Sequence, residues 1–282
     1  MSASLALALS VVMHVTWNLM ARHLPRVSSP LWWVLLAHLA LVAPWGFWEL
    51  ATTVTWTREL TLLLIVSATA NVVYFTGLAR AYEYAPVALV YPLVRSSPLL
   101  IAIWGSWLFG QELPSVAWAG IGISVLGLWI MASSARQGSD RQAFRWALLA
   151  MLATSVYSLS DKAATPQIPS FMGLVGFLSV GYLASWLAMT FHMRHRAKRW
   201  VPAQRISLFS MLVGGICIGL AYAFVIHAMR TLPAAEVVSY TNAGIVVATV
   251  LSIVVFNDRA GWQRRVLGAV IITSGLGVLA VR

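Results

Sequence analysis

The sequence predicts an all-α integral membrane protein in which ten transmembrane helices form two inverted five-helix repeats. Three observations lead to this fold class: the apolar composition, the length of the apolar segments, and a similarity between the two halves of the chain. Hydrophobic residues make up 60% of the 282 residues, charged residues only 10%, and the mean hydropathy is +0.81. Because a soluble domain cannot bury that much apolar surface, the composition indicates a lipid environment.

The apolar residues come in segments of about 20, which is the number a helix needs to cross a hydrocarbon layer roughly 30 Å thick. Short polar connections separate these segments. The expected helices are 4–22, 31–50, 60–81, 86–109, 114–134, 144–161, 170–193, 205–230, 234–256 and 262–281.

The basic residues are read as topology signals. The formal net charge is +11, but the 19 Lys and Arg residues lie between apolar segments and form no clustered patch on a soluble face, so a nucleic-acid partner is not expected. Fourteen of them fall in the connections after the odd-numbered helices. The positive-inside rule then places both termini in the periplasm of a bacterial inner membrane. The others are Arg58, Lys162, Arg230 and Arg282, in the remaining connections and at the C-terminus, and Arg95, inside a helix.

The two halves of the chain resemble each other at three places. Residues 14–22 align with 154–162, and both stretches end on a base. Residues 78–91 align with 227–240, and both end on a tyrosine. The third match places Gly120 and Gly127 opposite Gly268 and Gly275.

These matches define repeats at 1–135 and 144–282, joined by a polar linker at 136–143. An odd number of helices makes the second copy enter the membrane from the opposite side. The expected arrangement is therefore an inverted pair, which supports alternating access.

The motifs of the first half resemble the EamA family of the drug/metabolite transporter superfamily, in particular a bacterial ten-helix branch. They are Ala-Pro-Val-Ala-Leu-Val-Tyr-Pro at 85–92, then Pro98, Phe-Gly-Gln-Glu-Leu-Pro at 109–114, and the glycine-bearing segment 118–127. Glu112 and Gly120 fill the family's carboxylate and glycine positions, while Asp258 matches more loosely in the second half. The resemblance implies a carrier of amino acids, organic acids, phosphonates or other small metabolites.

Arg95 is the central candidate for substrate binding, because it lies ten residues into an apolar helix. A guanidinium at that depth costs roughly 2.5 to 3.5 kcal/mol and needs an anionic or carbonyl partner. Pro92 and Pro98 flank it, and each removes a backbone donor, so the helix is expected to be kinked or open there. The candidate charge partners are Glu236 and Glu112, and a purely structural pairing is the alternative to substrate binding.

Other polar and aromatic side chains at depth complete the candidate site. Tyr91 lies one turn before Arg95, and its repeat mate is Tyr240. His14 and Asn18 share one face of the first helix, beside Trp17, and either bind substrate or relay a proton, or hydrogen-bond between helices. The further candidates are Asn71, Tyr74, Tyr157 and Asn242.

No Asp or Glu is expected deep in a helix, which disfavours proton-coupled cation export. The sequence contains no phosphate loop, zinc-protease motif, nucleophile elbow or cysteine pair, so no enzyme activity, cofactor or metal is expected. The expected function is transport of a small anionic or zwitterionic metabolite by a monomer or homodimer. The alternatives are a permease or exporter for neutral or amine solutes, with Arg95 structural, and a membrane-embedded enzyme or lipid-handling protein.

Overall fold

The computed structural model describes residues 1–21, 24, 28–135, 141–257 and 259–281. Those residues form helices and connections, and no strand occurs among them. Arg22, Arg26, Asp258, Arg282 and the first part of the expected linker lie outside the described residues.

The chain divides into two compact units, each built from two separate stretches. Unit 1 comprises Met1–Val72 and Ser160–Arg230, and unit 2 comprises Val73–Leu159 and Thr231–Arg282. Each unit therefore combines residues from both expected repeats. Two long helices contribute to both units: α4 (Arg58–Tyr84) and α8 (Arg141–Ala164).

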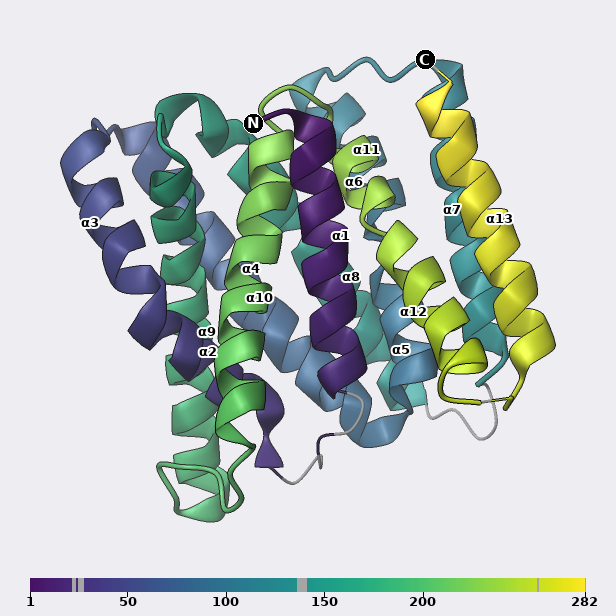
Figure 1. The fold of residues 1–282 in the computed structure, drawn as a ribbon. Coiled ribbons are helices and arrows are strands. Elements are labelled where there is room, and N and C mark those ends of the chain that lie inside the picture. The colour runs from purple at the N-terminus through teal and green to yellow at the C-terminus, as the bar shows by residue number, and fades with distance from the viewer. Residues whose placement is uncertain (22–23, 25–27, 136–140, 258, 282) are drawn as a thin grey trace. The chain divides into compact units, whose positions relative to one another are not determined.

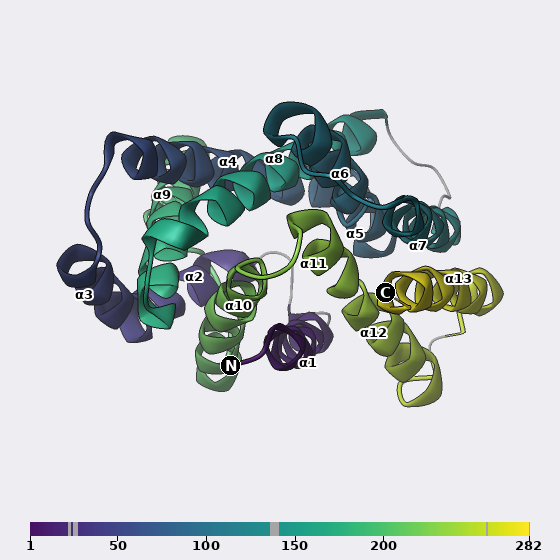
Figure 2. The ribbon, with the colours of Figure 1, turned by 90° about the horizontal axis from the view of Figure 1, so that it is seen from above.

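Unit 1 is built on two closely packed helix pairs, which are visible side by side in both ribbon views (Figures 1 and 2). One pair is α1 with α10, and the other is α3 with α9, while α2 packs on α9 and α10. The bounds are α1 (Ala3–Ala21), α2 (Pro30–Leu41), α3 (Ala43–Thr53), α9 (Phe171–Ala197) and α10 (Leu208–Ala228).

Glycine sets the spacing of the pair α3 and α9. A Cβ on Gly176 would lie 2.1 Å from the carbonyl oxygen of Gly46, a distance that no side chain tolerates. The two backbones are therefore in direct contact, as small residues allow in membrane helices. Between α2 and α3 the chain bends by 53° at Val42, just before Pro44.

Unit 2 contains two helices that are interrupted near their middles, and two that are straight and lie side by side. The straight pair is α7 and α13, whose close packing is seen in Figures 1 and 2. Leu128 and Ile272 meet in the buried core between them. The bounds are α5 (Val87–Val94), α6 (Ser97–Phe109), α7 (Ser115–Ser133), α11 (Ala234–Tyr240), α12 (Ala243–Val254) and α13 (Trp262–Ala280).

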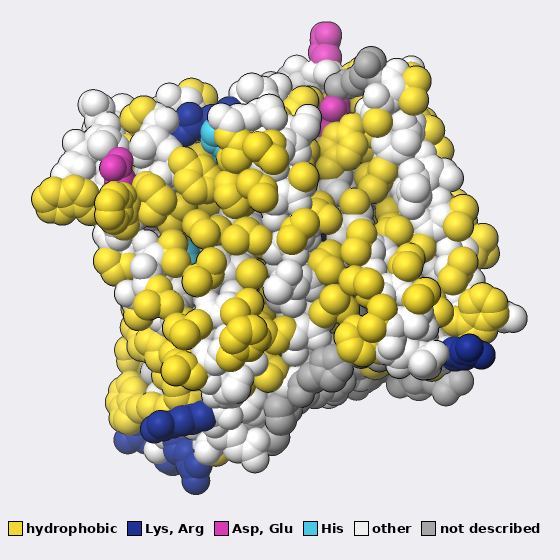
Figure 3. Space-filling view, viewed as in Figure 1, with side chains coloured by type: hydrophobic (Ala, Val, Ile, Leu, Met, Phe, Trp, Pro, Cys, Tyr) yellow, Lys and Arg dark blue, Asp and Glu magenta, His cyan; other side chains and the backbone are white. Residues whose placement is uncertain are grey.

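Seven helices of the described chain are long and apolar enough to cross a membrane, or eight if the bent pair α2 and α3 is one span. Large apolar side chains remain exposed along them, including Trp107, Phe209 and Val254. Hydrophobic side chains are spread across the face drawn in Figure 3, while Lys and Arg gather near its lower edge. So much exposed apolar surface indicates contact with lipid, and the protein is a multi-pass helical membrane protein.

The observed helices follow the expected segments closely, but three of those segments are divided. Residues 31–50 form α2 and α3, 86–109 form α5 and α6, and 234–256 form α11 and α12. The expected opening around Arg95 is confirmed, since α5 ends at Val94 and α6 begins at Ser97. The helix expected at 144–161 is longer at both ends in α8.

Candidate functional site

The two interrupted helices of unit 2 break at closely related positions. In the first, Arg95 and Ser96 form the turn between α5 and α6. In the second, Thr241 and Asn242 form the turn between α11 and α12. Each break lies within about one helical turn after the tyrosine, Tyr91 or Tyr240, that the repeat alignment pairs.

Proline explains the first break. Pro92 and Pro98 have no N–H group, so two hydrogen bonds of a continuous helix are missing. The chain closes the gap with a tighter turn, in which the amide of Ser96 donates to the carbonyl of Leu93 over 3.2 Å. The second break has no proline. There the amide of Asn242 donates to the carbonyl of Ser239 over 2.9 Å, again an i to i−3 bond.

The side chain of Arg95 connects the two breaks. Its Nη2 donates to the hydroxyl of Thr241 over 2.5 Å, and its Nε donates to Oδ1 of Asn242 over 3.2 Å. Asn242 returns a longer bond of 3.4 Å to the Arg95 carbonyl. The guanidinium carbon also lies 5.7 Å from the ring centroid of Tyr91, which confirms that these two residues share a face.

The guanidinium of Arg95 has only neutral partners. Among the described residues it makes no ion pair with Glu112 or Glu236, the expected charge partners. Glu112 is exposed between α6 and α7, and Glu236 is buried in the first turn of α11. A half-buried cation held by two polar side chains is oriented but not neutralised, so it can still bind an anionic group.

Two of the expected aromatic candidates are in contact with each other in unit 2. The rings of Tyr74 on α4 and Tyr157 on α8 meet edge to face, with centroids 5.6 Å apart. Tyr240 ends α11, immediately before Thr241, and is half-buried. The structure thus collects Arg95, Tyr91, Tyr74, Tyr157, Tyr240 and Asn242 in unit 2.

The remaining candidates belong to unit 1. His14 contacts the carbonyl oxygen of Ser10 through Nδ1 over 2.9 Å, within α1, and Asn18 is half-buried one turn further on. Trp17 is buried against Val34 and Cys217 and packs on Gly214 of α10. Asn71 donates to the carbonyl of Ser67 over 3.0 Å and packs on Gly181 of α9. Trp17 and Asn71 therefore contribute to helix packing.

A buried carboxyl group in unit 1 was not anticipated from the sequence. Asp161 is 1% exposed, and its two oxygens accept hydrogen bonds from Ser67 on α4 and Tyr222 on α10, each over 2.5 Å. Glu236, in unit 2, is 2% exposed. Both carboxyl groups lie near a helix end, Asp161 in the last turn of α8 and Glu236 in the first turn of α11, but the sequence did not indicate that Asp161 is buried. Asp161 was overlooked because the expected helix ended at this residue, whereas α8 continues to Ala164.

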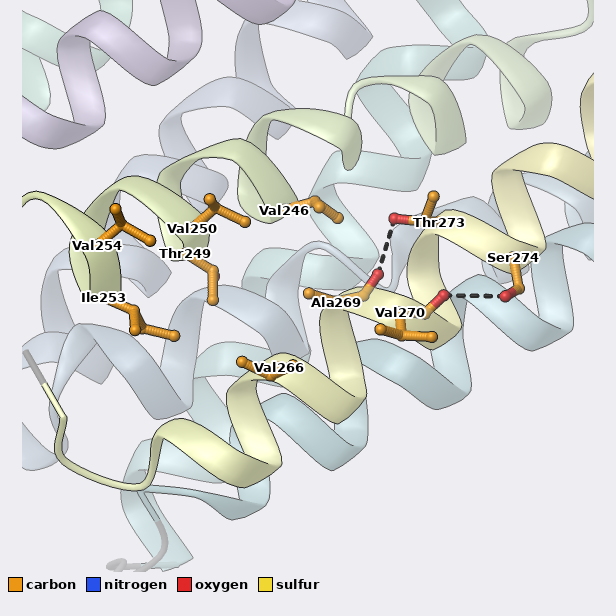
Figure 4. Close-up of a pocket in the computed structure, with 10 residues that line it drawn as sticks. All are labelled: Val246, Thr249, Val250, Ile253, Val254, Val266, Ala269, Val270, Thr273 and Ser274. Carbon is orange, nitrogen blue, oxygen red and sulfur yellow. Dashed lines mark hydrogen bonds between the residues drawn. The ribbon is translucent and has the colours of Figure 1, made fainter.

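A pocket of about 340 Å³ between α12 and α13 is apolar (Figure 4). Its few polar side chains are already bonded: Thr273 donates to the carbonyl of Ala269, Ser274 to that of Val270, and Thr249 to the sulfur of Met131 on α7. A groove of this composition suits an acyl chain and offers nothing to a polar metabolite.

Interrupted helices around a polar group are typical of multi-pass membrane transporters, in which broken helices expose backbone and side-chain groups to a substrate. Residues 1–133 match the EamA-like transporter family, over almost the same range as the first expected repeat. They belong to that family, which is part of the drug/metabolite transporter superfamily. This match, over a little under half of the chain, indicates a membrane transporter of this type.

Solved structures give the same fold over nearly the whole length. A crystal structure of a protein with 19% sequence identity superposes with a TM-score of 0.71, covering 99% of this chain and 96% of the other. It is among 28 matching chains of solved structures. At this identity the likeness shows the fold alone. No curated protein matches the sequence.

Proposed function

We propose that this protein carries a small anionic or zwitterionic metabolite, such as an amino acid, organic acid or phosphonate, across the bacterial inner membrane. The observation that carries the proposal is the guanidinium of Arg95, held between two helix breaks by Thr241 and Asn242 and paired with no carboxylate of the described residues. Transport proceeds by alternating access of two inverted repeats of five spans each.

Ten spans follow when each divided helix counts once. The pairs α2 with α3, α5 with α6, and α11 with α12 then give three spans, and the other seven long helices give one each. Two of those seven, α8 and α13, are not among the apolar candidates for membrane spans. In α8 the charged residues stand at the two ends, with Arg141 and Arg145 in the first turns and Asp161 and Lys162 in the last. In α13 they are Arg264 and Arg265, near its start. Both helices keep an uncharged centre.

The contact between α7 and α13 supports the inverted repeat. A Cβ on Gly120 would lie 2.8 Å from the carbonyl oxygen of Gly275, and a Cβ on Gly127 would lie 2.7 Å from that of Gly268. The repeat alignment pairs Gly120 with Gly268 and Gly127 with Gly275. Exchanging the members of each aligned pair turns one observed contact into the other, as a local twofold axis between antiparallel helices requires.

Charge chemistry favours an anion over a neutral solute. Arginine remains protonated at physiological pH, and its planar fork binds a carboxylate or phosphoryl group through two parallel hydrogen bonds. A protein that retains an uncompensated guanidinium within its helices incurs a cost of roughly 2.5 to 3.5 kcal/mol on insertion scales. An anionic substrate offsets that cost each time it binds.

The proposal is tested by a thermal-shift screen of the detergent-purified protein with amino acids, dicarboxylates, phosphonates, sugar phosphates and quaternary amines. We expect one anionic class to raise the midpoint of thermal unfolding of the wild type. Arg95→Ala and Arg95→Lys should abolish or reduce the shift, because neither provides the bidentate fork. Arg58→Ala, at the exposed start of α4, is the matched control and should retain it.

Two outcomes would reject the anionic substrate. Stabilisation by amines alone, unchanged in Arg95→Ala, would favour a permease or exporter of amine or neutral solutes in which Arg95 is structural. In that case Arg95→Gln should reduce the yield of folded protein more than ligand affinity. If no soluble class stabilises the protein, and lipids are turned over or translocated instead, the result would favour a lipid-handling protein or an enzyme.

A further inference from the structure

Three helices of unit 1 converge on one carboxyl group. Asp161 lies near the end of α8, Ser67 in α4 and Tyr222 in α10. The hydroxyl of Ser67 donates to Oδ1 of Asp161 and the hydroxyl of Tyr222 donates to Oδ2, both over 2.5 Å. All the hydrogen bonds of this side chain are with neutral groups.

Asp161 forms no ion pair among the described residues. The ammonium group of its neighbour Lys162 donates to the carbonyl oxygen of Met229. Tyr182, the tyrosine of α9, donates to the carbonyl of Ile218 over 3.2 Å. The titratable side chain that contacts the carboxyl group is therefore Tyr222, whose phenol is neutral at physiological pH.

A buried carboxylate without a cation is unfavourable, because the protein interior replaces its hydration only in part. Adding a proton removes that charge. The same three residues accommodate the proton without rearrangement: a protonated Oδ1 becomes the donor to the oxygen of Ser67, since a serine hydroxyl both donates and accepts. The phenol of Tyr222 continues to donate to Oδ2.

Asp161 and Ser67 lie close in sequence to the points where the chain passes between the two compact units. The chain passes between the two compact units after Val72 in α4 and again before Ser160 in α8. Ser67 lies five residues before the first crossing, and Asp161 is the second residue after the other. Ser67, Asp161 and Tyr222 therefore all belong to unit 1, and two of them lie within a few residues of the points where α4 and α8 continue into unit 2.

We propose that Asp161, with Ser67 and Tyr222, is a proton-binding site of the transport cycle. Protonation converts the carboxylate into a neutral carboxylic acid, and deprotonation returns it when the helices around it move. This role rests on the proposed transport function but does not depend on Arg95 or on which metabolite is carried. Changes in the surroundings of Asp161 then link proton movement to the exchange of conformations.

Infrared difference spectroscopy of the purified protein in liposomes, between about pH 5 and about pH 9, tests this directly, with the proton as the only ligand. We expect acidification to produce a carboxylic acid carbonyl band in the wild type that is absent from Asp161→Asn. Glu59→Gln, which removes an exposed carboxylate from α4, should retain that band. Tyr222→Phe should keep it at a shifted frequency, because one hydrogen bond to the acid is lost.

The outcomes separate this proposal from its rivals and from the anionic-substrate proposal. If the wild-type and Asp161→Asn spectra share every carboxylic acid band, Asp161 does not bind a proton in this range and the proposal fails. If sodium ions remove the band at constant pH, the group is a cation site and the proposal also fails. If Asp161→Asn does not fold, the frequency shift in Tyr222→Phe decides the question. Arg95→Ala should keep the band, so failure of the Arg95 experiment leaves this result untouched.

Discussion

At the scale of single residues, the hydrogen bonds that orient Arg95 support anion binding as much as the charge of the arginine does. Thr241 and Asn242 each present an oxygen to a different nitrogen of the guanidinium, and Tyr91 lies against it. Neutral acceptors fix the direction of the guanidinium without removing its charge. A carboxylate in their place would compete with an anionic substrate for the same nitrogen atoms.

Thr241→Val should weaken binding of the anionic ligand while leaving the fold intact. The variant keeps the shape of the side chain and removes the acceptor 2.5 Å from Nη2 of Arg95. A hydrogen bond of this kind contributes about 0.5 to 1.5 kcal/mol, so the apparent dissociation constant should rise between about two- and tenfold. The measurement is the concentration dependence of the thermal shift.

The matched control is Thr273→Val. Its hydroxyl donates to the Ala269 carbonyl of its own helix, beside the apolar groove between α12 and α13. This variant should bind as the wild type does. Equal weakening in both variants would mean that the effect of Thr241→Val is general and does not act through Arg95.

At the scale of helices, glycine determines how closely α7 and α13 approach. Along α7, Gly120 and Gly127 face the partner helix, whereas a Cβ on Gly122 would meet no atom within 4 Å. Along α13, Gly268 and Gly275 are in contact, and Gly277 has open space. Each helix therefore carries its own control position.

Gly127→Ala and Gly275→Ala should each destabilise the protein by about 1 to 3 kcal/mol, because the new methyl group forces the two backbones apart. Gly122→Ala and Gly277→Ala should be neutral or stabilising by up to about 1 kcal/mol, since alanine has the higher helix propensity. Thermal unfolding in detergent measures both effects. Equal midpoints for all four variants would show that the contact contributes no stability.

The sequence predicts some helix breaks and misses others for a physical reason. Pro92 and Pro98 reveal the break at Arg95, because proline withdraws a backbone donor wherever it stands. The break at Thr241 and Asn242 has no proline. It relies on polar side chains that compete with the helix for hydrogen bonds, a weaker local signal. The hydrogen bonds that bury Asp161 could not be predicted, because its partners, Ser67 and Tyr222, are distant in sequence.

At the scale of the whole molecule, residues distant in sequence complete each compact unit. Unit 1 joins residues 1–72 to residues 160–230. Unit 2 likewise joins residues 73–159 to residues 231–282. Periodicity and apolar length identify single helices but contain no information on this pairing. The four glycines of the repeat alignment lie at the contact between α7 and α13, where Gly120 meets Gly275 and Gly127 meets Gly268.

The distribution of basic residues makes a prediction about orientation that single-cysteine labelling can check. Cys217 is the only cysteine of the sequence and is buried, so Cys217→Ala provides a background without thiols. Thr55 and Lys198 are both exposed in unit 1, in connections expected on opposite sides of the membrane. By the positive-inside rule, Thr55→Cys should react with an impermeant maleimide in intact spheroplasts, and Lys198→Cys only after lysis.

If instead Lys198→Cys reacts in intact spheroplasts and Thr55→Cys only after lysis, the orientation in the membrane is the opposite of the predicted one, and the helices are unchanged. Labelling of both cysteines in intact spheroplasts would mean that the segments between them cross the membrane an even number of times. Residues 56–197 contain α4 to α9, which make five spans when α5 and α6 count as one. An odd number of crossings places the two thiols on opposite sides. The experiment therefore tests whether residues 56–197 cross the membrane an odd number of times and on which side Thr55 lies, without knowledge of the substrate.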